Sequence, residues 1–392
     1  MKNILEMSIN EMSNLDFECK CGKRHSLPIK EICIKNNALD ELNRVLSTFK
    51  DKKIFIFSDE NTYNAAGEKT VKILKNNNHT FKNFIIPNSK EILIPNEKIL
   101  GRLFMELEND TELIIAIGSG TINDLGKYLS VKTKIPYIII CTAPSMDGYA
   151  SDGSPLICDG YKISFEATLP YAIIGDVNIM KNAPDELIRA GFGDIVGKIT
   201  ALMDWKLSNI LTGEYICETC ITLTERAIQR VIDSADKLMN RDEKSVQYLL
   251  EALTFTGVAM GLVGVSRPAS GAEHMISHYW EMDFIKRNKY PYLHGIKVGI
   301  ATPIVLELFE LMKEDVPKEV FKYKYNKENV INLLKTIGAP TLPSEIEIDR
   351  NLFYNSMLGA YKVRKRYSIF KCAVERGKID EFSKIITEKI YG

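Results

Sequence analysis

The sequence has no net charge and too few cysteines for a disulfide framework. Its 51 Lys and Arg are balanced by 51 Asp and Glu, so the whole molecule lacks the positive field that attracts nucleic acid or an anionic membrane. Its eight cysteines are irregularly spaced, which predicts reduced thiols. The first eleven residues carry acids and polar groups throughout, which excludes the apolar region of a signal peptide, and no run approaches the roughly 18 apolar residues of a membrane span. These absences predict a cytoplasmic protein without a nucleic-acid or membrane partner.

Apolar residues make up 45% of the chain, enough to bury a substantial core in two domains. Short β-branched runs alternate with helical segments as far as Val177, which is typical of βαβ units around a buried parallel sheet. The clearest expected strands are 53–59, 80–86, 112–118 and 135–141. Two further pieces, 162–168 and 171–176, are expected to form a hairpin or an edge of the sheet.

After Lys181 the strand pattern ends and long segments of helical period follow. We therefore predict an α/β domain at 1–180, with a hairpin-like segment at 1–35, and an all-helical domain at 181–392. In proteins of two domains, ligand sites tend to lie in the cleft between them.

A glycine-rich turn, Gly118-Ser-Gly-Thr-Ile-Asn-Asp124, follows one expected strand and precedes a helix. The glycines let a phosphate approach, and the helix N-terminus offers N–H groups and a positive dipole end. The turn is not the GxGxxG fingerprint, whose acid lies about 20 residues downstream. Here the acid is upstream, at Asp59. Asp59 either accepts a hydrogen bond from a ribose hydroxyl or caps the next helix. In the first case it would repel a 2′-phosphate and so favour NAD over NADP. The turn predicts a pyrophosphate site, with a purely structural turn as the alternative.

The loop 141–155 leaves the expected strand 135–141 at the edge where open α/β sheets bind ligands. Its small hydroxyl residues, two Asp-Gly pairs and two prolines suit hydrogen bonds to a polyhydroxylated or phosphorylated ligand, although any turn-rich loop has this composition.

Three of the five histidines lie in one short segment. His274 and His278 are four residues apart and share a helix face, and His294 opens the next helix. A metal site built from imidazoles normally includes a carboxylate and leaves a position open for substrate. Asp194, among the small residues of 191–198, is the natural candidate for that carboxylate.

The cysteines offer a competing site in Cys19-Lys-Cys-Gly-Lys-Arg-His25. Two cysteines and a histidine can hold a metal, but the spacing without a second cysteine pair is not a zinc-ribbon pattern, and a short hairpin turning at Gly22 is the alternative. Cys217 and Cys220 lie inside a helical segment, where packed core thiols are expected.

Five motifs together resemble the sn-glycerol-1-phosphate dehydrogenase family of the dehydroquinate synthase-like and iron-containing alcohol dehydrogenase superfamily. They are GSGTIND (118–124), TAPSMDGYASDGSPL (142–156), GFGDIVGK (191–198), SGAEHMISHYW (270–280) and HGIKVGI (294–300). The resemblance implies a dehydroquinate synthase-like fold and reduction of dihydroxyacetone phosphate to sn-glycerol 1-phosphate by NAD(H) or NADP(H). It also implies one divalent ion, zinc or nickel, a homodimer, and a place in phospholipid metabolism.

The resemblance assigns residues to three kinds of contact. The metal ligands would be Asp194, His274 and His294. The substrate contacts would be Asp147, Asp194 and His278. The nucleotide contacts would be Asp59, Gly120, Thr121, Ile122, Asn123, Asp124, Thr142, Ala143, Pro144, Ser145 and Ser151.

Three of these side chains have expected roles in the reaction. His278 is the expected proton route, and Asp147 holds a substrate hydroxyl. Iron-type alcohol dehydrogenases carry a histidine four residues after the metal aspartate, and that position here is Lys198. Because an ammonium is no ligand, we expect three protein ligands and place Lys198 near the substrate phosphate.

Three other functions remain open from the sequence. One is a carbocycle-forming lyase of the dehydroquinate synthase type, which would use NAD transiently. Another is a different metal-dependent polyol dehydrogenase. The third is a regulatory protein that binds metal and nucleotide without turnover.

Overall fold

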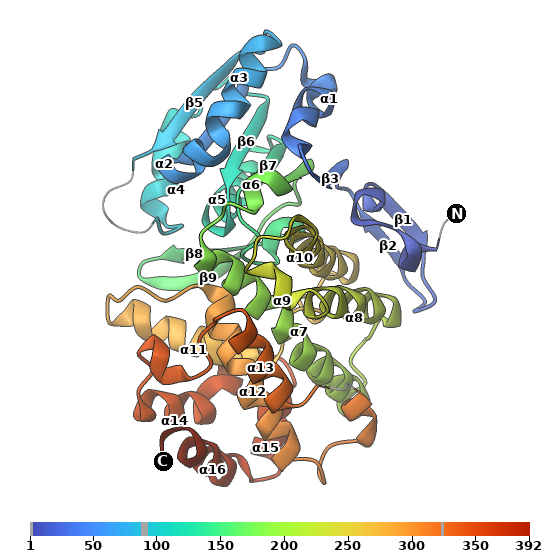
Figure 1. Cartoon of the computed structure of the whole chain (residues 1–392), viewed down its shortest axis with the longest axis vertical. Helices are drawn as coiled ribbons and strands as arrows, with labels where there is room; N and C mark the ends of the chain where they lie inside the picture. The colour runs from blue at the N-terminus through green and yellow to red at the C-terminus, as the bar shows by residue number, and fades with distance from the viewer. Residues whose placement is uncertain (1–2, 88–92, 323–324) are drawn as a thin grey trace. The chain divides into compact units, whose positions relative to one another are not determined.

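Most strands of the main sheet form where the short β-branched runs predict them, although the strand at Glu31–Lys35 was not expected. The computed structural model describes residues 3–87, 93–322 and 325–392. Six strands make a parallel sheet in the order β3-β10-β7-β6-β4-β5 (Figure 1). They are β3 (Glu31–Lys35), β4 (Ile54–Asp59), β5 (Phe81–Ile86), β6 (Leu113–Gly118), β7 (Tyr137–Cys141) and β10 (Ala172–Asp176).

The two strand pieces near residue 170 do not pair with each other, so that expectation is wrong. The segment Tyr161–Glu166 (β9) forms an antiparallel pair with Gly153–Cys158 (β8). Strand β10 instead lies between β3 and β7. All five of its residues are buried, which suits an inner strand covered on both faces.

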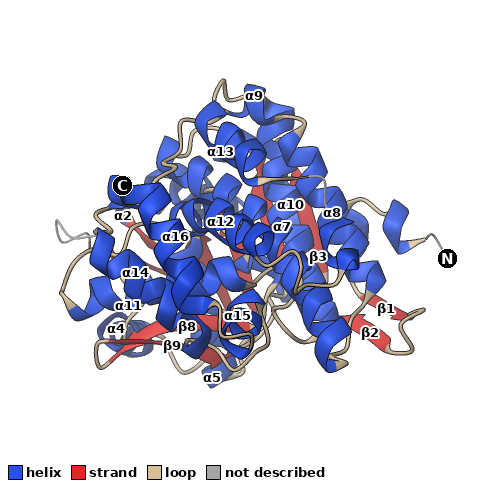
Figure 2. Ribbon diagram, turned by 90° about the horizontal axis from the view of Figure 1, so that it is seen from below, coloured by secondary structure: helices blue, strands red, loops and turns tan. Residues whose placement is uncertain are grey.

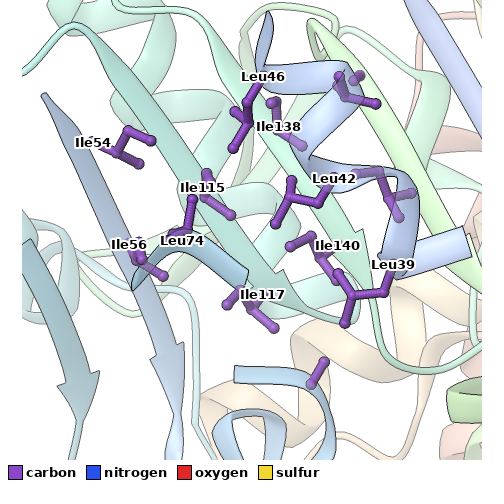
Figure 3. Packing of buried hydrophobic residues seen from close by; sticks show 14 of the residues in the cluster. Leu39, Leu42, Leu46, Ile54, Ile56, Leu74, Ile115, Ile117, Ile138 and Ile140 are labelled. Atoms are coloured by element: carbon purple, nitrogen blue, oxygen red, sulfur yellow. The ribbon is translucent and has the colours of Figure 1, made fainter. Parts of the chain in front are cut away.

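Alternate residues of the sheet pack against different helices. Ile115 and Ile117 lie in the core beneath residues 38–49 and helix α3 (Glu68–Asn76) (Figure 3). The opposite face carries Ala116, against which helix α5 (Gly120–Thr133) packs. A Cβ at Gly126 of α5 would lie 3.0 Å from the Ala116 Cβ, so a glycine allows this close approach.

The strand order changes direction between β4 and β6. From β4 the chain moves outward to β5 and then returns to the other side of β4 for β6 and β7. Open α/β sheets bind ligands beyond the carboxyl ends of the strands at such a switch point. Asp59 ends β4 and Gly118 ends β6, so both expected nucleotide elements start at this edge.

The chain divides into two compact units, one up to Pro184 together with Arg241–Leu262, the other Asp185–Asn240 with Val263–Gly392. The division differs from the predicted one because helix α10 (Glu243–Val263) packs mainly with the sheet unit. A Cβ at Gly257 of α10 would lie 2.7 Å from the Asp147 carbonyl oxygen, and Gly175 of β10 lies directly against Leu250.

Helix α10 differs from the expectation that no apolar run approaches the length of a membrane span. Among the described residues it is the one helix long and apolar enough for a membrane span, with mean hydropathy 1.4 over an 18-residue window. The core helix of a soluble protein has the same character, and 78% of this window is buried. Only the length and composition of α10 resemble those of a membrane span.

The smaller elements of the first unit surround the sheet. At the N-terminus, η1 (Ile4–Glu6) and η2 (Ile9–Met12) precede an antiparallel hairpin of β1 (Leu15–Glu18) and β2 (Arg24–Leu27). The others are η3 (Ala38–Glu41), α1 (Leu42–Val45), η4 (Leu46–Phe49), α2 (Glu60–Thr62), η5 (Tyr63–Gly67), α4 (Glu97–Glu106), η6 (Gly148–Ala150) and α6 (Val177–Met180).

The regular elements described in the second unit are all helical (Figure 2). They are α7 (Asp185–Thr212), α8 (Glu218–Ile232), α9 (Ala235–Leu238), α11 (Ala272–Lys286), α12 (His294–Leu311), η7 (Lys318–Lys322), α13 (Lys327–Thr336), η8 (Pro343–Ile346), α14 (Arg350–Gly359), η9 (Ala360–Lys362), α15 (Ile369–Glu375) and α16 (Ile379–Tyr391). The backbones of helices α7 and α12 come into direct contact at Gly193 and Gly295. This is possible because glycine has no Cβ, for which the contact leaves no room. This close packing brings Asp194 of α7 next to the start of α12.

Candidate metal and nucleotide sites

All three predicted metal ligands meet in the helical unit. Asp194 lies on α7, His274 on α11, and His294 is the first residue of α12. Each offers one ligand atom, and these atoms lie within 4.8 Å of one another. The His274 Nε2 atom is 3.7 Å from Asp194 Oδ1, and the two imidazole rings have centroids 4.9 Å apart. The structure thus brings together a carboxylate and two imidazoles from three helices.

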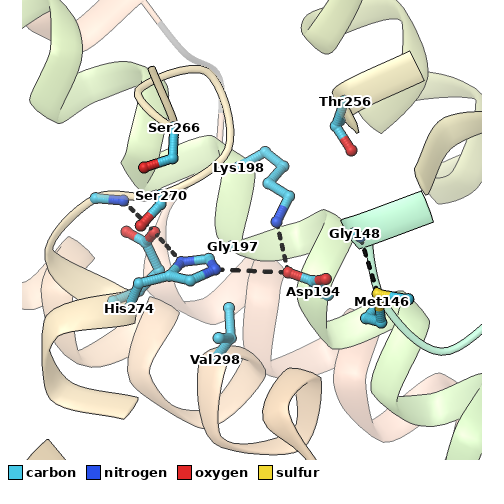
Figure 4. Close-up of polar contacts among 12 residues, drawn as sticks. Met146, Gly148, Asp194, Gly197, Lys198, Thr256, Ser266, Ser270, His274 and Val298 are labelled. Carbon is cyan, nitrogen blue, oxygen red and sulfur yellow. Dashed lines mark hydrogen bonds and ion pairs between the residues drawn. The ribbon is translucent and has the colours of Figure 1, made fainter. Parts of the chain in front are cut away.

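Lys198 contacts this group directly. It lies one turn after Asp194, both side chains are fully buried, and Lys198 Nζ is 2.5 Å from Asp194 Oδ1. Figure 4 shows Lys198 and His274 both pointing toward the Asp194 carboxylate. Burial, reinforced by the Lys198 charge, lowers the pKa of His274 well below its usual range. His274 is therefore neutral near pH 7, the form of imidazole that binds metal ions.

Glu273 orients His274, a role that the sequence reasoning missed. Its Oε1 atom accepts the Gly271 N–H at 2.6 Å and lies 2.7 Å from His274 Nδ1. The other carboxylate oxygen accepts the Thr200 hydroxyl at 2.7 Å. Because Oε1 acts as an acceptor, Nδ1 carries the imidazole proton and Nε2 keeps its lone pair toward Asp194. The only sequence signal was an acid directly before a predicted ligand.

His278 lies one turn after His274 but faces a different set of groups. Arg364 donates to His278 Nε2 at 3.0 Å. Since a guanidinium can only donate, Nε2 is unprotonated and the proton is on Nδ1. That atom lies 3.5 Å from Glu281 Oε2. In this arrangement the predicted proton carrier, His278, is neutral. Its Nε2 lone pair accepts the hydrogen bond from Arg364.

Arg364 belongs to a basic group that the sequence reasoning also missed. Its neighbour Arg366 donates to the Ser266 hydroxyl and the Ser270 carbonyl, both at 2.9 Å. Burial, together with the charge of Arg364, lowers the pKa of Arg366 to about 10. The run Arg364-Lys-Arg366 was the available signal, but its spacing alone does not place it beside His278.

In the sheet unit, the glycine turn and the loop after β7 meet at neighbouring strand ends. The Thr142 N–H donates to the Gly118 carbonyl at 3.1 Å. The hydroxyls of Ser119 and Ser145 are 2.5 Å apart. Gly120 begins α5, where a Cβ would lie 3.2 Å from the Met146 side chain. The predicted nucleotide residues of these two segments are thus assembled at one edge.

Several predicted nucleotide residues already have structural partners. Asp59 caps α2, since its Oδ1 accepts the Thr62 N–H at 2.8 Å, as the alternative reading of this acid expected. The Asn123 side chain donates to the Gly148 carbonyl at 3.1 Å. The Ala143 carbonyl accepts the Tyr149 hydroxyl at 2.7 Å. Nucleotide contacts by these residues remain predictions, as do those of the remaining segment residues, Thr121, Ile122 and Pro144.

Lys127 links two of the predicted nucleotide residues. Its fully buried ammonium donates to the Ser151 hydroxyl at 3.0 Å and to the Gly153 carbonyl at 2.9 Å. It also lies 3.4 Å from Asp124 Oδ1. Burial raises the pKa of Asp124 to about 6, although the Lys127 charge opposes the shift. The helix after the glycine turn is therefore tied to the loop that carries Ser151.

Comparisons with known proteins agree with the motifs. Residues 33–184 match the family model of iron-containing alcohol dehydrogenase. The glycerol-1-phosphate dehydrogenase [NAD(P)+] of Geobacillus thermodenitrificans is 31% identical over 95% of this chain and 98% of its own length. The chain belongs to the glycerol-1-phosphate dehydrogenase family. A member from the archaeon Thermococcus sibiricus is 34% identical over 87% of this chain and 91% of its own. The resemblance and the enzyme class, an oxidoreductase, are confirmed.

Solved structures confirm the fold class. Maleylacetate reductase from Rhizobium matches with a TM-score of 0.71 at 12% identity, over 91% of this chain and 95% of its own. The iron-containing alcohol dehydrogenase of Corynebacterium glutamicum also gives 0.71, at 14% identity, over 92% and 96%. At these identities the likeness shows the fold alone, an α/β part with a parallel sheet and a helical part.

The contacts of Glu273 lead to a prediction about metal affinity in this family member. Glu273→Gln puts an amide where the carboxylate holds His274, and is expected to weaken metal binding by about 10–100-fold. Competition with a chelator of known affinity measures the change. Glu251→Gln, which alters a buried carboxylate on α10, serves as the control. Unchanged affinity in a folded Glu273→Gln protein would show that the contact does not orient His274.

Proposed function

We propose that the chain reduces dihydroxyacetone phosphate to sn-glycerol 1-phosphate with NADH or NADPH, using one divalent ion such as zinc or nickel. The observation that carries this proposal is the group of Asp194, His274 and His294, in which Asp194 and His274 are buried and the ligand atoms lie within 4.8 Å of one another. It occurs in a chain whose relatives are named glycerol-1-phosphate dehydrogenase [NAD(P)+].

The donor set fits a divalent transition metal. One carboxylate and two imidazoles suit zinc and nickel alike, and leave room for a substrate oxygen. His274 is neutral, and Glu273 holds its Nδ1 so that Nε2 can act as the ligand atom. When bound, the ion polarises the substrate ketone and stabilises negative charge on its oxygen.

The chain's own residues then bind the phosphate and deliver a proton. Lys198 balances the Asp194 charge, and its predicted place is near the substrate phosphate. Arg364 and Arg366 add cationic groups beside His278. A phosphate that attracts Arg364 would open its bond to His278 and leave Nε2 available. His278 then takes up a proton from solvent at Nε2 and passes it to the substrate oxygen, and Asp147 holds a substrate hydroxyl.

The nucleotide is proposed to bind at the switch-point edge of the sheet. Its pyrophosphate lies on the turn Gly120 to Asp124 and on the segment Thr142 to Ser145, with Ser151 nearby. The Asp59 carboxylate, if it turns toward a ribose hydroxyl, favours NAD over NADP. The homodimer, the cytoplasmic location and the role in phospholipid metabolism belong to the same proposal.

A stereospecific assay on protein of known metal content tests this function. We expect one NADH or NADPH oxidised per dihydroxyacetone phosphate reduced, and sn-glycerol 1-phosphate as the product. Chelation should remove the activity, and zinc or nickel should restore it. The opposite enantiomer, or full activity in demetallated protein, would contradict the proposal. Turnover that needs only catalytic amounts of NAD would indicate the lyase. Preference for an unphosphorylated ketone would indicate another polyol dehydrogenase. Binding of the ligands without any product would indicate a regulatory protein.

A further inference from the structure

The N-terminal hairpin brings three potential metal ligands together outside the reaction site. The Cys19 N–H donates to the Lys23 carbonyl at 2.9 Å, and the Gly22 N–H donates to the Cys19 carbonyl at 3.0 Å. Gly22 has φ +83°, a left-handed conformation that glycine adopts without strain. The expected hairpin turn at Gly22 is therefore present, and it carries Cys19 and Cys21 at its tip.

His25 follows on β2 and is directed toward these cysteines. Its side chain is buried, and Nδ1 lies 2.6 Å from the carbonyl oxygen of Leu262 at the end of α10. Because a carbonyl only accepts, Nδ1 carries the proton and Nε2 keeps its lone pair. Nε2 lies 3.3 Å from Cys21 Sγ. A carbonyl on the far ring nitrogen is a common way to orient a metal-binding imidazole.

We propose that Cys19, Cys21 and His25 bind a zinc ion through two thiolates and Nε2. Their ligand atoms lie within 4.8 Å of one another. With Zn–S of about 2.3 Å and Zn–N of about 2.0 Å, tetrahedral geometry places a sulfur and a nitrogen about 3.5 Å apart. The 3.3 Å between Cys21 Sγ and His25 Nε2 needs only a small widening. A donor from elsewhere, such as water, would complete the coordination.

The proposed ion has a structural role rather than a part in the reaction. Binding releases the two thiol protons, so the ion meets two thiolates and one neutral imidazole. A hairpin with two four-residue strands is marginal by itself. The ion would close its turn onto β2 and, through the His25 bond to Leu262, hold the hairpin against α10. The sulfur donors also distinguish this site from the oxygen and nitrogen donors of Asp194, His274 and His294.

Cobalt provides a direct test, because Co²⁺ bound by thiolates shows a ligand-to-metal charge-transfer band that nitrogen and oxygen ligands do not give. Adding Co²⁺ to the metal-free full-length chain is expected to produce this band, and Zn²⁺ is expected to displace it. The double substitution Cys19→Ser and Cys21→Ser should remove the band. His274→Ala should keep it, since that site has no thiolate. Cys158→Ser, which changes a thiol on β8, is the matched control and should also keep it.

A second variant covers the case in which the double mutant does not fold. His25→Cys retains a donor and adds a third thiolate, so the band should become more intense at equal cobalt occupancy. An unchanged band in this variant would exclude His25 as a ligand. Absence of the band in the unaltered chain, or its persistence in a folded Cys19→Ser and Cys21→Ser protein, would overturn the site. Neither result depends on the dehydrogenase activity.

Discussion

The His274→Ala variant is expected to lose turnover by about three orders of magnitude or more. A bound ion supplies several kcal/mol of charge stabilisation to the developing alkoxide, which corresponds to about that loss. The His274 ring is held in place by Glu273, which in turn accepts the Thr200 hydroxyl. Removing the imidazole should therefore release the ion. Steady-state kcat and metal content per chain measure the two effects together.

The control for this variant is another buried imidazole. His79 in the sheet unit lies 3.3 Å from the Asn43 side chain and has no proposed role in catalysis. His79→Ala is expected to keep both its metal content and its kcat, while circular dichroism verifies folding of both variants. If His274→Ala retained more than about a tenth of the activity at full metal occupancy, His274 would not be a ligand.

Lys198→Met is expected to raise the KM for dihydroxyacetone phosphate and to lower kcat/KM by about a hundredfold or more. The substitution removes a buried ammonium near the proposed phosphate position. It also leaves Asp194 without its counter-ion in the metal-free protein. Breaking such a buried pair typically costs about 3–5 kcal/mol of unfolding free energy. A divalent ion would take over the neutralisation of Asp194, so saturating metal should reduce this loss of stability.

The two effects of Lys198→Met can be measured separately. Substrate dependence of the initial rate reports KM, and denaturant unfolding with and without metal reports stability. Lys206→Met lies on the same helix and alters a more exposed lysine that pairs with Glu218, so neither quantity should change much. An unaltered KM in the Lys198→Met protein would place the phosphate elsewhere, with Arg364 and Arg366 as a cationic alternative within the helical unit.

Local features of this protein were readable from the sequence. Strands β4, β5, β6 and β7 lie within two residues of their predicted bounds, because β-branched runs and helical periods are properties of short segments. The turn from Gly118 to Asp124 follows for the same reason. The histidine count pointed to His274, His278 and His294, since a rare residue type concentrated in one segment is visible without any structure. The motifs in order were specific enough to indicate the family.

Tertiary structure alone decided which distant segments meet. Strand β10 enters the sheet between β3 and β7, and α10 joins the sheet unit, although nothing in their own sequences specifies those partners. Arg364 reaches His278 across 86 residues. Such contacts depend on the packing of whole elements, where small residues such as Gly193 and Gly295 set how closely two helices approach. The sequence identifies which chemical groups are available, whereas the packing of the elements determines which of these groups share a site.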